Sequence, residues 1–81
     1  MERNKKKYLT KKAKIILGEA LSLDYKEITE DASPVSYENW DSLNHVKLIL
    51  IIENEIGRKM QTKEMLSINS LESIKKVISK N

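Results

Sequence analysis

Apolar residues recur at helical spacing in three separate stretches, and this periodicity limits the possible folds more than any other feature. In residues 7–20 one apolar face is formed by Leu9, Ala13, Ile16, Leu17 and Ala20. In residues 42–56 the expected inner face consists of Val46, Ile49, Ile52 and Ile56, and in residues 71–78 it consists of Leu71, Ile74, Val77 and Ile78. Steps of three and four residues place each set on one face of a helix. No stretch alternates as a strand does, so the pattern predicts an all-α protein.

Residues with capping preferences mark where these helices begin and end. Asp41 precedes the second stretch as its expected N-cap, and Gly57 follows that stretch as its expected stop. Ser70 is the expected N-cap of the third stretch. Between them, Thr62 is expected to cap a short helical turn over residues 63–66. The sequence therefore predicts a bundle of three main helices plus one short helix.

A long connection, residues 21–40, separates the first two helices. It contains Asp, Ser, Pro and Asn, which favour turns. A structureless loop of this length is uncommon in a compact domain. We therefore expect Leu23, Ile28 and Val35 to anchor the loop in the core, and Trp40 to fix the entry to the second helix.

Length and composition exclude several classes of protein. The chain has 81 residues, which suits a single domain spanning residues 1–81, with a basic, frayed segment at residues 1–6. It has no Cys and one His, which excludes disulfides and a Cys nucleophile and leaves no metal site to expect. The longest apolar run, residues 48–52, is far too short to span a membrane. No secretory signal is visible, so we expect a cytoplasmic monomer.

Charge is unevenly distributed along the chain. Residues 1–14 hold seven Lys or Arg and one Glu, a net charge of +6, whereas residues 15–81 hold eight Lys or Arg and eleven Asp or Glu, a net charge of −3. A basic start is either a solvated helix end or a contact surface for nucleic acid. In the second case the protein is a small basic nucleic-acid-binding helical module. The residues that would then contact phosphates are Lys5, Lys6, Lys7, Lys11, Lys12 and Lys14.

The strongest candidate for chemistry is Ser42, which opens the second helix directly after the long loop. The first backbone N–H groups of a helix lack internal partners, and with the helix dipole they favour an anion. A phosphodiester built on the Ser42 hydroxyl would meet that environment. We expect Asp41 to hold the helix start in shape and Leu43 to tuck inward and anchor the first turn. Ordinary helix capping would explain the same three residues.

His45 lies one turn after Ser42 and suggests a Ser–His nucleophile pair. Such a pair needs a close hydrogen bond, an oriented imidazole and an oxyanion site. A helix surface in a short bundle rarely supplies these. We therefore expect His45 to be exposed or to contact a bound group or a partner, and we expect no catalytic residue.

At this point the sequence resembles the acyl carrier protein family. The resemblance begins at Asp41-Ser42-Leu43 and covers most of the chain, roughly residues 14–79. Residues 24–33 resemble the loop signature of the family, and residues 66–71 resemble the approach to its last helix. The positions that agree with the pattern of its second helix are Val46, Leu48, Ile49, Ile52, Glu53 and Ile56.

The resemblance implies a carrier, not an enzyme. It makes Ser42 the attachment site of a covalent 4'-phosphopantetheine, with Asp41 and Leu43 as the flanks of the motif. The thiol of that arm would hold an acyl or aminoacyl group as a thioester. The implied partners are a holo-acyl-carrier-protein synthase, which is a phosphopantetheinyl transferase, and acyl-activating and acyl-transferring enzymes. No membrane or nucleic acid is expected as a partner. An adaptor that kept the fold and lost the arm is the third alternative, and an intact Ser42 argues against it.

The sequence departs from the family at several positions near the motif. Asn44, Lys47 and Asn54 stand where fatty-acid carriers are often acidic. Asn39 replaces a usual Gly and is expected to adopt the left-handed conformation that the Gly would take. The stretch from Trp40 to His45 resembles stand-alone carriers of specialised bacterial pathways, such as those for surface polysaccharide or secondary metabolites. We therefore expect a specialised biosynthetic pathway.

Overall fold

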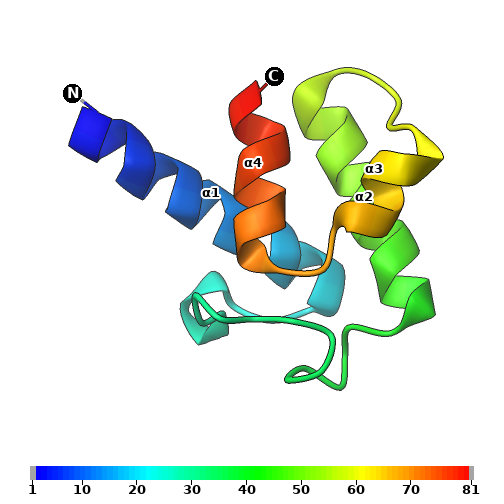
Figure 1. Cartoon of the computed structure of the whole chain (residues 1–81). Coiled ribbons are helices and arrows are strands. Elements are labelled where there is room, and N and C mark those ends of the chain that lie inside the picture. The colour runs from blue at the N-terminus through cyan, green and yellow to red at the C-terminus, as the bar shows by residue number, and fades with distance from the viewer. Residues whose placement is uncertain (1, 81) are drawn as a thin grey trace.

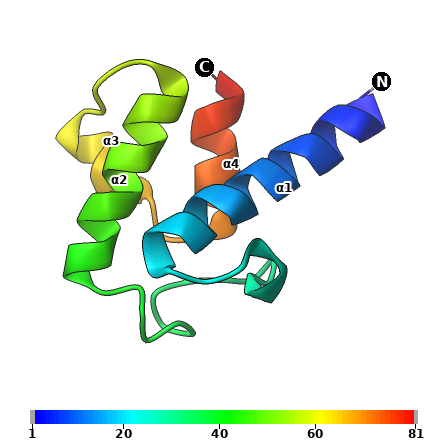
Figure 2. The same cartoon turned by 180° about the vertical axis from the view of Figure 1, so that it is seen from behind.

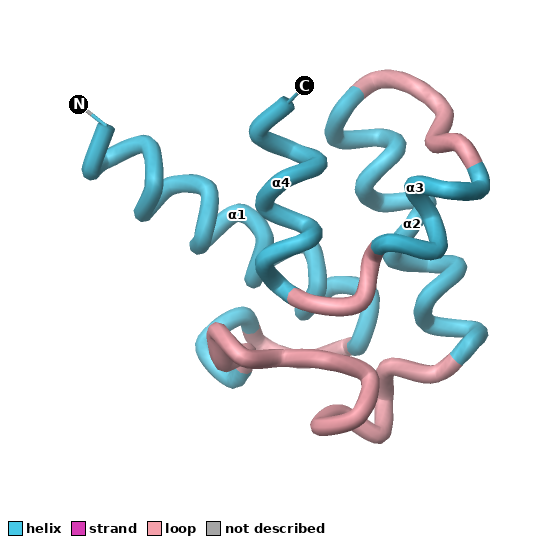
Figure 3. The backbone as a smooth tube through the Cα atoms, viewed as in Figure 1, coloured by secondary structure: helices cyan, strands magenta, loops and turns pink. Residues whose placement is uncertain are grey.

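Five helical elements make up the structure, which is a computed structural model that describes the backbone of residues 2–80 and the side chains of residues 7–80. They are α1 (Glu2–Leu21), the 3₁₀ turn η1 (Tyr25–Glu27), α2 (Ser42–Ile56), α3 (Thr62–Ser67) and α4 (Leu71–Lys80). The described part of the chain contains no strand (Figure 3). The predicted all-α bundle of three main helices and one short helix is confirmed, as is the long first loop.

The first helix, α1, makes more contacts with other elements than any other helix does. It packs against α2, α4 and η1, and α4 also contacts α2. Its N-terminal part extends beyond the other elements (Figures 1 and 2). It begins at Glu2 rather than at the predicted residue 7, because Lys and Arg are good helix formers even without an apolar face. Residues 1–6 were expected to be frayed. Met1 and the side chains of residues 2–6 lie outside the described part of the chain, so this expectation stays a prediction.

The core lies between α1, α2 and α4 and is covered from one side by the long loop. Its buried residues are Ala13, Ile16, Leu17, Ala20, Leu21, Ile28, Ala32, Trp40, Leu48, Ile49, Ile52, Met60, Ile68, Leu71 and Ile74. Within the described residues, no helix has both the length and the apolar character that crossing a bilayer requires.

The inner face of α2 differs from the predicted one. Ile49 and Ile52 are buried as expected, but Val46 is 57% exposed and Leu48, which the prediction omitted, is fully buried. Residues 48–52 are all apolar, so several faces of α2 look alike in sequence. Packing against α1 and α4 decides which face turns inward.

The predicted start and end of α2 and the predicted start of α4 follow local rules. The Asp41 carboxylate accepts a hydrogen bond from the backbone N–H of Asn44 at 2.9 Å, as an N-cap does. Gly57 ends α2 in the left-handed conformation with φ 74°. The Ser70 hydroxyl accepts from the N–H of Ser73 at 3.1 Å at the start of α4. All three capping predictions are confirmed.

The predicted cap of α3 is wrong by one residue. Thr62 is already the first residue of the helix, and Gln61 occupies the N-cap position. The backbone N–H of Gln61 donates to the Glu64 carboxylate at 3.1 Å. A Glu three residues after the cap makes this reciprocal bond, so Glu64 sets where α3 starts.

The long loop is anchored by a partly different set of residues from the one predicted. Ile28 is buried and Leu23 packs against the core, as expected, but Val35 is 97% exposed. Tyr37 contributes instead: its hydroxyl accepts from the N–H of Thr29 at 2.9 Å and donates to the carbonyl of Glu27 at 3.1 Å. The ring of Tyr37 packs against the core while its hydroxyl makes hydrogen bonds across the loop. Val35 has no polar group and could not make these bonds.

Candidate functional site

Ser42 is the first residue of α2, where the long loop meets that helix (Figure 1). Its side chain is exposed. Its hydroxyl makes no hydrogen bond with any residue between 7 and 80 whose side chain is described. The oxygen is therefore open to solvent and to any enzyme that approaches this end of the helix.

The backbone around Ser42 offers unpaired donors. Asp41 occupies two N–H groups of the first turn: its carboxylate accepts from Asn44 at 2.9 Å, and its carbonyl accepts from His45 at 2.8 Å. The N–H groups of Ser42 and Leu43 donate to no described residue. Two free donors at the positive end of a helix favour a negatively charged group beside the Ser42 hydroxyl.

Two asparagines fix the approach of the loop to α2. The Asn44 side chain donates to the carbonyl of Asn39 at 2.7 Å, and the Asn39 side chain donates to the carbonyl of Leu21, at the end of α1, at 3.3 Å. The expected left-handed conformation of Asn39 is wrong, since the described residues with positive φ are Ser22 and Gly57. Asn39 acts through its amide group. Position 44 must supply a hydrogen-bond donor to the carbonyl of Asn39, and a carboxylate side chain could not do so.

The imidazole of His45 joins three elements next to Ser42. Its Nδ1 accepts from the indole N–H of Trp40 at 3.0 Å, and its Nε2 lies 3.2 Å from the carbonyl oxygen of Met65 in α3. The Trp40 and His45 rings are stacked, with centroids 6.3 Å apart. An indole N–H only donates and a carbonyl only accepts, so both bonds require the neutral imidazole with its proton on Nε2.

This arrangement removes His45 from consideration as a base for Ser42. Both ring nitrogens are engaged with groups other than Ser42, as described above. The expectation that His45 is exposed is wrong, since its ring is half-buried; its contact with a bound group or a partner stays a prediction. Met65 lies twenty residues away in sequence, so no local pattern signals the contact. Trp40 does fix the entry to α2, as predicted, and is only 4% exposed.

Leu43 does not anchor the first turn. It is 69% exposed because it lies nine residues from Ile52, which places the two side chains on opposite sides of α2. With Val46 and Leu50 it forms an exposed apolar stripe at helical spacing that begins beside Ser42. The exposure of Val46 was missed because α2 is apolar on several sides.

A shallow depression lies at this end of the molecule. It has a volume of about 330 Å³ and is lined by Pro34, Trp40, Asp41, Ser42 and His45. It brings together Ser42 and Asp41, which the sequence singled out, with the two ring residues. Among the described residues, no group of three or more His, Asp or Glu side chains could hold a metal ion.

The basic first helix is partly occupied by contacts within the molecule. Lys12 forms an ion pair with Glu55 at 3.0 Å, which joins α1 to α2. Lys11 lies 5.4 Å from the ring centre of Tyr25. Two of the lysines that a nucleic-acid-binding module would use, Lys11 and Lys12, therefore make contacts within the molecule, on its surface.

Curated proteins named acyl carrier protein match the chain over most of its length. One from Thermotoga maritima is 32% identical over 69 residues, which cover 85% of this chain and 85% of that protein. One from Petrotoga mobilis is 34% identical over 71 residues, covering 88% and 84%. One from Buchnera aphidicola is 33% identical over 72 residues, covering 89% and 92%. No family model matches the chain.

Proposed function

The chain belongs to the acyl carrier protein family, whose members are carriers and not enzymes, and from this premise we propose that Ser42 bears a covalent 4'-phosphopantetheine arm. One observation carries the proposal: the Ser42 hydroxyl is exposed, has no hydrogen bond to a described side chain, and stands at the first position of α2. Asp41 and Leu43 flank it as the motif requires.

The residues around Ser42 fit such an arm. The unpaired N–H groups of Ser42 and Leu43 suit the negative charge of a phosphodiester. The depression beside them is open and has room for the start of a flexible chain. The Asp41 carboxylate, the negative group at this position, is turned back into the first turn by its bond to Asn44.

The chemistry required of the protein itself is small. Ser42 Oγ attacks the phosphorus of coenzyme A that bears the pantetheine, the new O–P bond forms, and the pyrophosphate bond to adenosine 3',5'-bisphosphate breaks. The hydroxyl proton passes to a base on the transferase, because both nitrogens of His45 are already engaged. When bound, the arm supplies a thiol that holds an acyl or aminoacyl group as a thioester. The chain has no Cys that could compete for that group, and tethering raises the effective concentration of the cargo at each partner enzyme.

We extend the proposal to the setting of the carrier. It is a single domain that acts as a cytoplasmic monomer and meets a holo-acyl-carrier-protein synthase and then acyl-activating and acyl-transferring enzymes. A specialised biosynthetic pathway is supported by Lys47, which places a positive charge on the exposed side of α2. Enzymes with basic docking surfaces would be repelled there.

Intact-protein mass measurement tests the assignment. Incubated with coenzyme A and a broad-specificity transferase, the protein should gain the mass of one phosphopantetheinyl group, because Ser42 is open to the transferase. Ser42→Ala should gain nothing, while Ser67→Ala, which removes another exposed serine, should be modified like wild type. A wild-type protein left unmodified by several transferases would contradict the proposal and favour an adaptor without an arm.

A further inference from the structure

The third helix is the least anchored of the four α-helices. It contains no buried residue, whereas α2 and α4 each contribute buried residues to the core. Met60 before it and Ile68 after it are buried. Burial of apolar surface is the main force that holds a helix in place. Because Met65 packs against the core from α3 while only half-buried, the position of α3 also depends on its flanks and on polar contacts.

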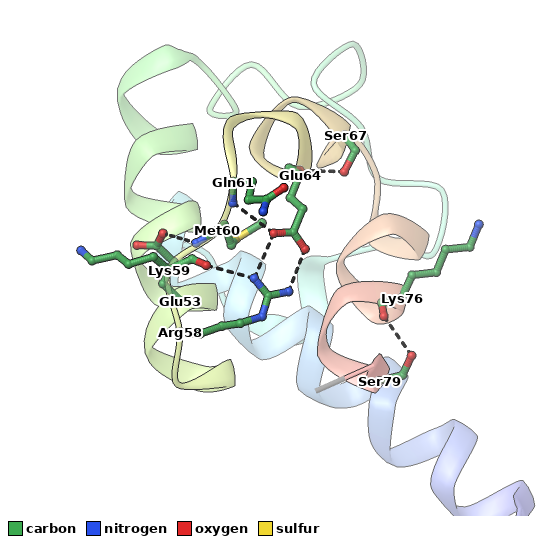
Figure 4. A network of polar contacts seen from close by, with 9 residues as sticks. All are labelled: Glu53, Arg58, Lys59, Met60, Gln61, Glu64, Ser67, Lys76 and Ser79. Atoms are coloured by element: carbon green, nitrogen blue, oxygen red, sulfur yellow. Dashed lines mark hydrogen bonds and ion pairs between the residues drawn. The ribbon is translucent and has the colours of Figure 1, made fainter.

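Polar contacts hold α3 at both of its ends. Before its first turn, the Glu53 carboxylate in α2 accepts from the N–H of Met60 at 2.7 Å, and Arg58 pairs with Glu64 at 2.7 Å (Figure 4). At its last turn, the Met65 carbonyl meets His45. Among the described residues, the His45 contact is the hydrogen bond that ties this last turn to α2, and it lies beside Ser42.

We infer that His45 is a positioning residue that keeps α3 closed against α2, so that cargo on the Ser42 arm stays on the surface of the bundle. The inference rests on the proposed function of Ser42. Met65 of α3 packs against the buried core, so an apolar group tethered there would enter the core beneath α3 or beneath the long loop only if that segment moved aside. Trp40 closes the loop side, and the bond from His45 closes the α3 side.

This closure points to a class of cargo. A long acyl chain left on the surface exposes its apolar area to water at a cost that grows with its length. A short or polar group, such as a short acyl or an aminoacyl group, has little such area and gains little from burial. The closed bundle therefore suits short or polar cargo, for which the shallow depression beside Ser42 is sufficient.

The rate at which hydroxylamine cleaves the thioester shows whether the cargo lies on the surface or inside the bundle. The transferase loads the protein from acetyl- or octanoyl-coenzyme A, and hydroxylamine then attacks the thioester carbonyl, which releases the hydroxamate and the free thiol of the arm. Each rate is divided by that of the matching free thioester of N-acetylcysteamine, which removes the intrinsic difference between the two acyl groups. In wild type we expect the two normalised rates to agree within about twofold, because neither group is sheltered.

Three substitutions of His45 distinguish the loss of its bond to α3 from a general loss of structure. His45→Gln keeps a donor that can reach the Met65 carbonyl and should behave like wild type. His45→Asn keeps an acceptor for Trp40 and loses the bond to α3, and His45→Ala loses both. In the last two, the octanoyl rate should fall by about fivefold and the acetyl rate should not, because one net hydrogen bond shifts an opening equilibrium by about that factor. A merely structural defect would change both rates together.

A second readout needs no arm. Amide hydrogen exchange in residues 62–67 of the unmodified protein should be about fivefold faster in His45→Asn than in His45→Gln, because α3 opens more often. Octanoyl cargo strongly protected in wild type, or equal exchange in the two variants, would overturn the inference. Failure of wild type to accept any arm would instead contradict the proposed function, and the exchange measurement would still test His45.

Discussion

Glu64 has a depressed pKa because several donors favour its charged form. The side-chain hydrogen bonds from Arg58 contribute most, followed by the backbone N–H of Gln61, and together they lower the pKa of Glu64 from 4.5 to about 2. The two guanidinium nitrogens lie 2.9 and 2.7 Å from the two carboxylate oxygens (Figure 4). One side chain thus caps α3 and joins it to the loop that precedes it.

Loss of Arg58 should raise the pKa of Glu64. A lowered folded-state pKa means that the charged carboxylate stabilises α3 above pH 4.5 and that this contribution is lost as the pH falls toward 2. In Arg58→Gln the carboxyl titration followed by NMR should move from about 2 toward 4.5. Lys59→Gln removes the same charge from the neighbouring residue and should leave the midpoint near 2. Equal midpoints in the two variants would show that the bidentate pair is not the cause.

At the scale of the element, α1 and α2 are each followed by a residue in the left-handed conformation, but the residue types differ. After α1, Ser22 takes the left-handed conformation with φ 60°, and the N–H of Leu23 donates to the carbonyl of Gly18 at 2.8 Å. After α2, Gly57 takes that conformation with φ 74°. Glycine adopts it without steric cost, whereas serine does not. The end of α1 is therefore the more strained of the two.

Exchanging these residue types should change stability in opposite directions. Ser22→Gly should raise the free energy of unfolding by about 0.5–1 kcal/mol, because it removes the steric penalty at positive φ. Gly57→Ala should lower it by about 1 kcal/mol. Apart from Gly57 itself and its two chain neighbours, no atom lies within 4 Å of the added Cβ, so that cost is conformational. Urea unfolding measures both, and a destabilised Ser22→Gly protein would contradict the assignment of strain to Ser22.

At the scale of the whole molecule, charge is unevenly distributed. The first fourteen residues carry a net charge of +6, and the remainder carries −3. The exposed apolar stripe of Leu43, Val46 and Leu50 runs along α2 away from Ser42, and the exposed Lys47 lies beside it. A partner that engages Ser42 meets an apolar surface with a positive charge at its edge.

Reversing that charge should change the choice of partner. Lys47→Glu should raise kcat/KM for fatty-acid enzymes with basic docking surfaces by about three- to tenfold at low salt, because a repulsion becomes an attraction. The gain should shrink as ionic strength rises. Lys26→Glu makes the same charge change in η1, away from α2, and should have little effect. If both variants respond equally, net charge and not the surface of α2 governs recognition.

Local sequence patterns were sufficient to predict the four α-helices and to place Ser42 at a helix start, but not the 3₁₀ turn η1 within the long loop. Helical periodicity, the caps Asp41 and Ser70 and the stop at Gly57 act within a few residues of each other, so a linear pattern contains them. The position of Ser42 at a helix start, and hence its free hydroxyl, follows from the same local rules. Even the one misplaced cap, at Thr62 instead of Gln61, is an error of a single residue.

Which side chains are covered depends on how the helices pack in three dimensions. Leu43, Val46 and Val35 were expected inside and are exposed, and Leu48 was overlooked and is fully buried. Burial depends on where other helices lie, and an α2 that is apolar on several sides leaves that choice to α1 and α4. The bridge from His45 to Met65 spans twenty residues of sequence. A contact of this kind exists only once the chain has folded back on itself, because nothing local brings those two groups together.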